Sequence, residues 1–263
     1  MTSSLLAPRG RSRISTTGGG TAVGSTDPTR ILNWRHPLVA SLRRELDMPT
    51  GVEPTDRMAI LRRAHRRITA TVRPVYSVQD ARPVSEVLRR GRGSCSQRLA
   101  VLEAVARASG VATRVRGLLV DGAFWYPRFP RLRRLVPDQV LLAWPEFRIE
   151  GLSPTVHATA PWLPVSELFG SLGELSDGHG GGFTNADAET LFEALSRTAI
   201  DWDGATTLCP AAGASCDLSA YVLADLGRLD SRDELFARHG QTLCWTARAL
   251  AEPVLGRRRP ADT

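Results

Sequence analysis

The chain has 263 residues, of which 42% are hydrophobic and 23% charged, a composition typical of a soluble globular protein. This length allows one large domain or one domain with a sizeable appendage. All 34 residues counted as lysine or arginine are arginines, because the sequence contains no lysine. This excludes P-loop nucleotide hydrolysis, which needs a phosphate-binding lysine, and Schiff-base catalysis, which needs a lysine amine.

The formal net charge of +7 favours an acidic partner. The sequence has no zinc-finger spacing and no basic motif interleaved with aromatic residues, so we expect a small acidic protein rather than nucleic acid. No apolar run approaches the ~20 residues of a membrane helix, and the N-terminus lacks the apolar segment of a signal peptide. We therefore predict a cytoplasmic protein that makes no membrane contact.

The first half of the chain predicts a disordered tail followed by three helices. Residues 1–28 are rich in Ser, Thr, Gly and Arg and cannot form a core. Residues 37–46 and 56–72 then carry apolar side chains at helical spacing. A third helix is expected to begin near Pro83 and to end at Gly91 and Gly93.

The remaining elements predict an α+β fold in which a helix packs on a small antiparallel sheet. A helix is expected from Cys95 to Gly110, then a strand over 111–120, a hairpin turn at Asp121 and Gly122, and strands over 140–144 and 147–152. Further helices are expected over 164–175, from Asn185 or Asp187 to Thr198, and over 217–227, 231–239 and 242–255. These patterns divide the chain into a core at 29–160, a helical region at 161–256 that covers the site, and a basic tail at 257–263.

Cys95 is the strongest candidate for a functional residue. It stands in the run RGSCSQRL (residues 92–99), directly after a predicted loop and directly before a helix. Unpaired backbone N–H groups and the helix dipole at that position favour the reactive thiolate. The alternative is a buried cysteine that fills space as a small apolar residue. The four cysteines form no Cys-x-x-Cys pair, so we expect reduced thiols and no metal site.

The order of helix, glycine-rich turn, cysteine at a helix start and strands, over roughly residues 80–152, resembles the transglutaminase-like superfamily of cysteine enzymes. The residues that carry the resemblance are Gly91, Gly93, Cys95 and the stretch 104–114. The resemblance implies a transglutaminase-like, papain-like core. It also implies a histidine that opens one strand and an aspartate that ends the next. Here Gln139 stands at the first position and residues 152–155, which contain no carboxylate, at the second, so these strands cannot supply the usual triad.

Within that superfamily the chain looks like the Dieckmann cyclases of tetramic acid and pyridone biosynthesis. The similarity lies in its size, its Gly93-Ser94-Cys95-Ser96-Gln97 run and its predicted helical C-terminal third. The resemblance implies that Cys95 takes an N-(β-ketoacyl)aminoacyl group from an acyl or peptidyl carrier protein and closes a ring by carbon–carbon bond formation, without a cofactor. Backbone N–H groups of Ser96 and Gln97 would hold the oxyanion. The alternatives are an acyltransferase or amide-forming transglutaminase-like enzyme, and a catalytically inactive binding relative.

The general base has to come from five histidines. His239 is our first choice, because a helix C-terminus stabilises its imidazolium. His157 and His179 are the alternatives; His157 follows the third predicted strand and His179 lies in a glycine-rich loop. His65 lies among arginines on a helix, which predicts a solvated face, and His36 has no catalytic context.

Asp121, at a strand end before Gly122, is the first choice for the carboxylate that orients the base, and Asp138 is the second. An ordinary turn aspartate explains Asp121 equally well. The predicted catalytic set is therefore Cys95, Asp121 and His239. The predicted apolar lining of the site, which core packing would also explain, is Phe124, Trp125, Tyr126 and Trp144.

Overall fold

A four-stranded antiparallel sheet forms the centre of the fold. The computed structural model describes residues 22–46, 54–151, 161–176, 181–205, 216–243 and 245–257. The spatial order of the strands is β5-β4-β3-β6, and each neighbouring pair is antiparallel. The strands are β3 (Thr113–Asp121), β4 (Gln139–Arg148), β5 (Trp162–Pro164) and β6 (Val222–Leu229).

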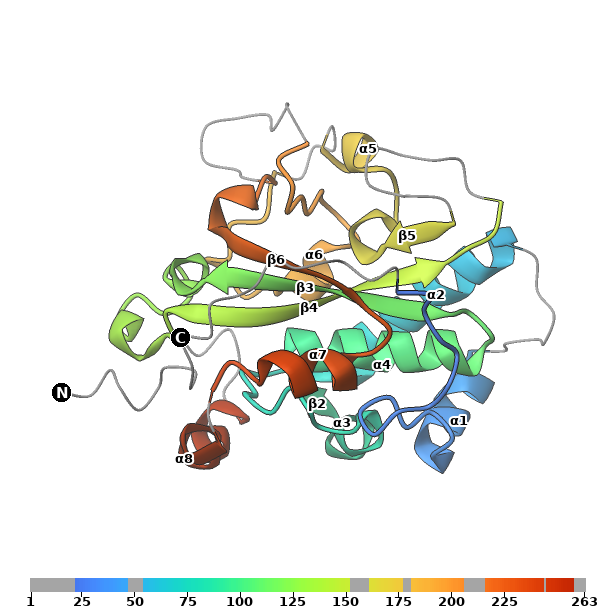
Figure 1. Ribbon diagram of the computed structural model, residues 1–263, viewed down its shortest axis with the longest axis horizontal. Coiled ribbons are helices and arrows are strands. Elements are labelled where there is room, and N and C mark those ends of the chain that lie inside the picture. The colour runs from blue at the N-terminus through green and yellow to red at the C-terminus, as the bar shows by residue number, and fades with distance from the viewer. Residues whose placement is uncertain are drawn as a thin grey trace.

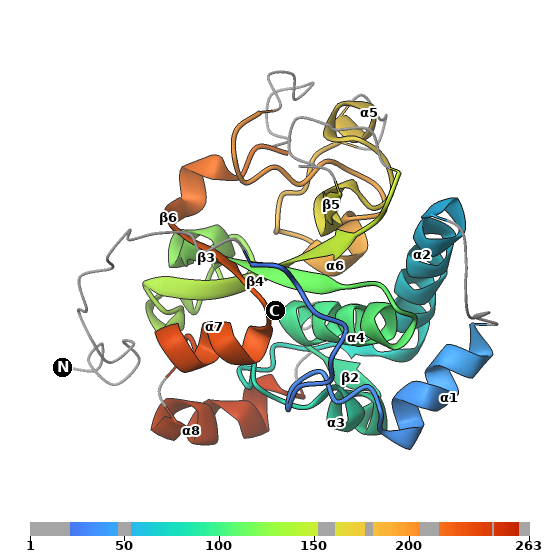
Figure 2. The same cartoon turned by 45° about the vertical axis from the view of Figure 1, so that its right-hand side comes forward.

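The helices lie on both sides of this sheet (Figure 1). They are α1 (Pro37–Glu45), α2 (Pro54–Thr71), α3 (Val84–Arg90), α4 (Cys95–Ala108), α5 (Leu172–Ser176), α6 (Leu191–Ala194), α7 (Arg232–His239) and α8 (Trp245–Leu255). Figure 2 shows α3, α4, α7 and α8 on one side of the strands and α5 on the other. Among the described residues, no helix is both long and apolar enough to cross a bilayer.

The helix α4 lies at the centre of the core. Its side chains Leu99, Val101, Leu102 and Val105 are all fully buried. The helix packs against α1, α2 and α3 on one side and against β4 on the other. A helix that is apolar around most of its circumference is stable only in such an enclosed position.

A tight glycine turn delivers the chain to α4. Gly91 ends α3 in the left-handed conformation with φ +58°, which a side chain would disfavour. The short strand β2 (Arg92–Gly93) then pairs in parallel with β1 (Arg73–Pro74). A Cβ atom on Gly93 would lie 2.9 Å from a methyl group of Val87, so the close approach of α3 and β2 requires glycine there. The turn thereby fixes where Ser94 and Cys95 begin α4.

Several predicted elements agree with the structure and one changes type. The helices expected over 37–46, 56–72, 231–239 and 242–255 correspond to α1, α2, α7 and α8, and the strand over 111–120 corresponds to β3. The helix expected over 217–227 is wrong, because this segment contributes the strand β6 to the sheet. Exposure alternates along most of β6: Leu223 and Asp225 are exposed, whereas Val222, Ala224 and Leu226 are only partly exposed. Such alternation between neighbouring residues is typical of a strand. The C-terminal region that is expected to be mostly helical therefore also contains the strands β5 and β6.

Four other boundaries differ from the predictions. The two strands expected over 140–144 and 147–152 are one strand, β4, which continues through Pro145. Pro145 is tolerated because β5 pairs only with Glu146 to Arg148, so β4 is an edge strand where the proline lies. Asp121 and Gly122 do not form a two-residue hairpin, since a 3₁₀ turn (Gly122–Trp125) and a longer connection precede β4. The helices expected over 164–175 and up to Thr198 shrink to α5 and α6.

Gly122 gives a direct test of the packing around the connection between β3 and β4. A Cβ atom there would lie 1.9 Å from the carbonyl oxygen of Pro137, and backbone cannot move aside as a side chain can. We expect Gly122→Ala to lower the free energy of unfolding by about 1–3 kcal/mol, measured by urea denaturation. The matched control is Gly173→Ala in α5, where nothing lies within 4 Å. An equal loss in both variants would contradict this packing.

Candidate active site

Cys95 is the first residue of α4, and its neighbours fix the start of the helix. Ser94 is the N-cap: its hydroxyl accepts a hydrogen bond from the Gln97 backbone N–H (3.3 Å), and the Gln97 side-chain oxygen accepts one from the Ser94 N–H (3.1 Å). This reciprocal pair is a capping box. Cys95 is partly buried and its thiol is free. The thiol therefore stands at a defined point on the helix.

Cys95 lines a cavity of about 480 Å³. The walls come from residues 75–80, the first turn of α4, the segment from Phe124 to Pro137, the first part of β4, and α8. The wall residues are mostly aliphatic and aromatic: Val75, Tyr76, Val78, Phe124, Trp125, Phe129, Leu132, Val136, Pro137, Val140, Leu141, Leu142, Leu191, Leu243, Leu250, Ala251, Val254 and Leu255. Such a cavity has the size and apolar character of a site for a small ligand.

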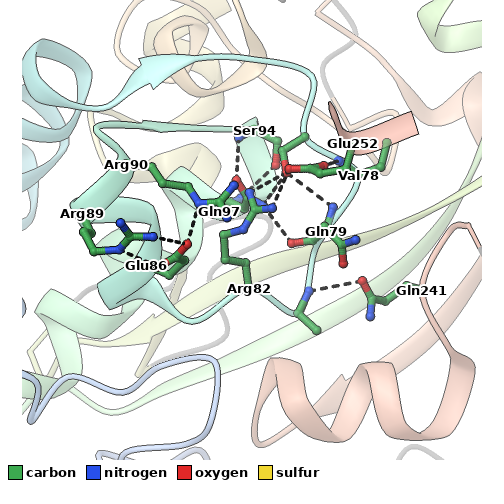
Figure 3. Close-up of polar contacts among 12 residues, drawn as sticks. Val78, Gln79, Arg82, Glu86, Arg89, Arg90, Ser94, Gln97, Gln241 and Glu252 are labelled. Carbon is green, nitrogen blue, oxygen red and sulfur yellow. Dashed lines mark hydrogen bonds and ion pairs between the residues drawn. The ribbon is translucent and has the colours of Figure 1, made fainter. Parts of the chain in front are cut away.

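A buried polar network attaches α8 to the rest of the cavity wall (Figure 3). The Glu252 carboxylate of α8 accepts hydrogen bonds from the Ser77 hydroxyl (2.9 Å), the Val78 N–H (2.9 Å) and the Arg82 guanidinium (2.5 Å). The Gln97 amide donates to the Ser77 hydroxyl (2.7 Å) and to the Gln79 carbonyl (2.8 Å). The network therefore joins α8, residues 77–82 and the first turn of α4.

The surroundings of Cys95 keep its thiol protonated near neutral pH. Burial is the largest effect and raises the pKa of Cys95 to about 12. Arg98 and Arg232 lower this pKa and Glu193 raises it, while a hydrogen bond from the Phe192 backbone lowers it. The expectation that the helix start favours the thiolate is wrong for the resting protein, because desolvation outweighs the favourable charges. Nucleophilic attack by this sulfur therefore requires a base.

The cavity wall also contains the carboxyl group of Asp80, a residue that no sequence pattern indicates. Burial raises the pKa of Asp80 to about 6, whereas Arg232, a hydrogen bond from the Ser96 side chain, and Arg248 lower it. The residue lies in the connection between β1 and α3, where neither helical nor strand periodicity marks it. Only the tertiary structure brings this connection over the start of α4.

An ion pair between Arg232 of α7 and Glu103 of α4 lies directly behind this part of the site. Neither side chain is exposed at all. Arg232 also donates to the Ser96 hydroxyl (3.0 Å) and to the Ala143 carbonyl of β4 (3.2 Å). One guanidinium thus fixes the relative positions of α4, α7 and β4 next to the cavity.

Breaking this buried pair should destabilise the protein strongly. We expect Arg232→Met to lower the free energy of unfolding by roughly 3–5 kcal/mol, because Glu103 stays buried without its partner. The control is Arg238→Ala, which breaks a surface pair with Glu234 in the same helix and should cost less than about 1 kcal/mol. Chemical denaturation of both variants measures the difference. Equal losses would show that the buried pair carries no special role.

Of the predicted catalytic residues Cys95, Asp121 and His239, only Cys95 lines the cavity. Asp121 caps the following 3₁₀ turn, where its carboxylate accepts the Ala123 N–H at 2.8 Å. His239 is exposed at the end of α7, and burial and Arg238 lower its pKa, opposite to the direction expected from the helix dipole. The alternative carboxylate Asp138 is exposed.

The other histidines divide into two described side chains and two outside the described residues. His65 is buried in α2 rather than solvated; its Nε2 atom lies 2.6 Å from the Phe192 carbonyl and its pKa is lowered to about 4 by burial. His36 caps α1 by accepting the Leu38 N–H. His157 and His179 lie outside the described residues. Within the described part of the chain, no histidine lines the cavity.

The family resemblance implies a histidine at the position of Gln139 and an aspartate near residues 152–155, and the structure describes the first of these positions. Gln139 is exposed at the start of β4, where it pairs with Asp121, and β4 faces the cavity through Val140, Leu141 and Leu142 instead. Residues 152–155 lie outside the described residues.

Half of the predicted lining is confirmed, and one of the two predicted oxyanion donors is occupied by another bond. Phe124 and Trp125 line the cavity, but Tyr126 and Trp144 do not, and Trp144 packs against Trp202 instead. The Gln97 N–H is bound to Ser94 in the capping box and is therefore unavailable to an oxyanion. The Ser96 N–H remains the candidate donor.

The described side chains do not form a metal site, since no three His, Cys, Asp or Glu residues gather among them. Cys216 is disulfide-bonded, so the expectation of four reduced thiols is wrong for this residue.

Comparison with known proteins gives one match. Residues 44–166 match the family model of the transglutaminase-like superfamily, a range that contains α2, α3, α4, β3, β4 and β5. This superfamily typically includes cysteine enzymes. No curated protein and no solved structure matches the chain.

Proposed function

Because residues 44–166 match the family model of the transglutaminase-like superfamily, we propose that the protein catalyses acyl transfer at Cys95 and binds the acyl chain in the adjoining cavity. The observation that carries the proposal is the position of Cys95 at the start of α4, the only cysteine among the described residues of the cavity wall, facing about 480 Å³ of mostly apolar space. Each methylene group that leaves water for such a space contributes about 0.8 kcal/mol to binding.

The proposed step forms an acyl-enzyme. The Cys95 sulfur attacks the carbonyl carbon of an acyl thioester, a new carbon–sulfur bond forms, and the bond to the departing thiol breaks. The proton of Cys95 leaves the attacking sulfur and ends on the departing thiolate. The Ser96 N–H, at the positive end of α4, supports the oxyanion of the intermediate.

The narrower form of the proposal is Dieckmann-type ring closure of an N-(β-ketoacyl)aminoacyl thioester delivered by a carrier protein. The methylene between two carbonyls loses a proton, and its carbanion attacks the Cys95 thioester, which closes the ring and releases the thiol. A carboxyl group in the cavity supports this form, because such a methylene is acidic enough for a weak base. An acidic carrier would fit the exposed side chains of Arg131, Arg133 and Arg134, which flank the wall residue Leu132.

A second candidate is a binding protein without covalent chemistry. The raised pKa of Cys95 favours this candidate. The apolar character of the cavity wall, to which Leu142 of β4 contributes, also favours it. In that case the cavity holds an apolar ligand and Cys95 is part of the wall.

Intact-mass spectrometry after incubation with pantetheine thioesters separates these candidates. Acyl transfer predicts a mass increase equal to the acyl group, and peptide mapping places it on Cys95. Ring closure predicts a released cyclic product only from the β-ketoacyl-aminoacyl thioester. Protection of the fold against heat by fatty acyl ligands, with no mass increase from any thioester, would favour the binding protein and contradict acyl transfer.

A further inference from the structure

Asp80 is the only carboxyl side chain among the described residues that line the cavity. The Ser96 side chain, which follows Cys95 in the first turn of α4, is among the groups that stabilise the Asp80 carboxylate. The carboxyl and the thiol therefore line the same cavity, although the two residues come from different segments. General acid–base catalysis requires the proton acceptor to reach the thiol, directly or through one water molecule.

The charges that face Asp80 come from two helices. Arg232 of α7 and Arg248 of α8 favour its ionised form, and Glu252 of α8 opposes it. Both arginines also have other partners: Arg232 binds Glu103 and Ser96, and Arg248 donates to the Leu243 carbonyl at 2.6 Å. Asp80 is thus a partly buried carboxyl group near two arginines that also bind other groups.

We propose that Asp80 is the catalytic base of the cavity, which takes the proton of the Cys95 thiol as the sulfur attacks a thioester and returns it to the departing thiolate. The inference rests on the proposed acyl transfer. It answers the need for a base where no described histidine lines the cavity. The proton count balances, because the thiol of Cys95 is consumed, one thioester replaces another, and the leaving group departs as a neutral thiol.

The pH dependence follows from the protonation of Asp80. With a pKa of about 6 its carboxyl is mostly ionised at pH 7 and mostly protonated at pH 5, so its capacity to accept a proton rises through that range. The thiol of Cys95 stays protonated throughout. The rate of acylation should therefore rise about tenfold per pH unit below pH 6 and level off above it.

The test compares wild type, Asp80→Asn, Asp80→Glu and Ser96→Ala in the rate of acylation of Cys95 by an octanoyl-pantetheine thioester between pH 4.5 and 9. We expect Asp80→Asn to lose roughly 10²–10⁴-fold at pH 7.5 and to lose the rise near pH 6. Asp80→Glu should recover part of the rate. Ser96→Ala removes the hydrogen bond but keeps the carboxyl, so it should lower the rate less and retain the rise.

The outcomes separate the two proposals. If Asp80→Asn is acylated at the wild-type rate with the same pH profile, Asp80 is only an anchor for α4 and the inference fails, while acyl transfer stands. If wild type is acylated without any rise near pH 6, the inference also fails, and this holds even where Asp80→Asn does not fold. If wild type is never acylated at any pH, both proposals are overturned.

Discussion

Replacing Cys95 with alanine is expected to abolish acyl transfer, and replacing it with serine to lower the rate by about 10³-fold or more. Alanine carries no nucleophile, and a serine hydroxyl is far less nucleophilic than sulfur. Neither change disturbs the start of α4, because the capping box is made by Ser94 and Gln97. Release of free thiol from an octanoyl thioester measures the rate.

The same variants separate chemistry from binding. Cys95→Ala keeps the apolar walls, so it should still bind a fatty acyl ligand with an affinity within a few fold of wild type. Isothermal titration with octanoyl amide, which cannot acylate a thiol, measures this affinity. Turnover by Cys95→Ala at the wild-type rate would exclude Cys95 as the nucleophile.

Filling the cavity from α8 is expected to block long acyl chains. Ala251 lines the cavity, so Ala251→Trp places an indole in the space where the chain would lie. The value of kcat/KM should fall at least tenfold for dodecanoyl thioesters and much less for acetyl thioesters, because only long chains need the occupied volume.

The matched control is Ala249→Trp in the same helix. Ala249 is exposed and is not part of the cavity wall, so the same substitution there adds an indole to the surface. Its kcat/KM should stay close to wild type at every chain length. A fall that is equal in both variants, or independent of chain length in Ala251→Trp, would contradict the cavity as the acyl site.

The sequence predicts the start of α4 well because the signals there are local. Ser94 and Gln97 have the spacing of a capping box, and Gly91 and Gly93 mark the preceding turn. The apolar residues that follow identify a helix whatever its surroundings. The segment that becomes β6 has no such local signal. Its alternation over Val222 to Leu226 is short, and pairing with β3 decides its conformation.

The partners of Cys95 could not be predicted because the cavity is assembled from distant segments. Local features, a turn and a helix end, indicate Asp121 and His239. In the structure Asp121 caps a turn and His239 is exposed. Asp80 belongs to a connection, residues 77–82, that hydrogen bonds to Glu252 attach to α8, and no local pattern indicates this contact. The raised pKa of Cys95 likewise depends on burial, which no local pattern reveals.

The most direct measurement is a crystal structure of the protein after reaction with a dodecanoyl thioester. The account predicts continuous density from the Cys95 sulfur into the cavity, with the chain lying between the Phe124 to Pro137 segment and α8. It also predicts the Asp80 carboxyl beside the thioester. An unmodified Cys95 together with a chain bound elsewhere, or a cavity that remains closed to the chain, would contradict the account.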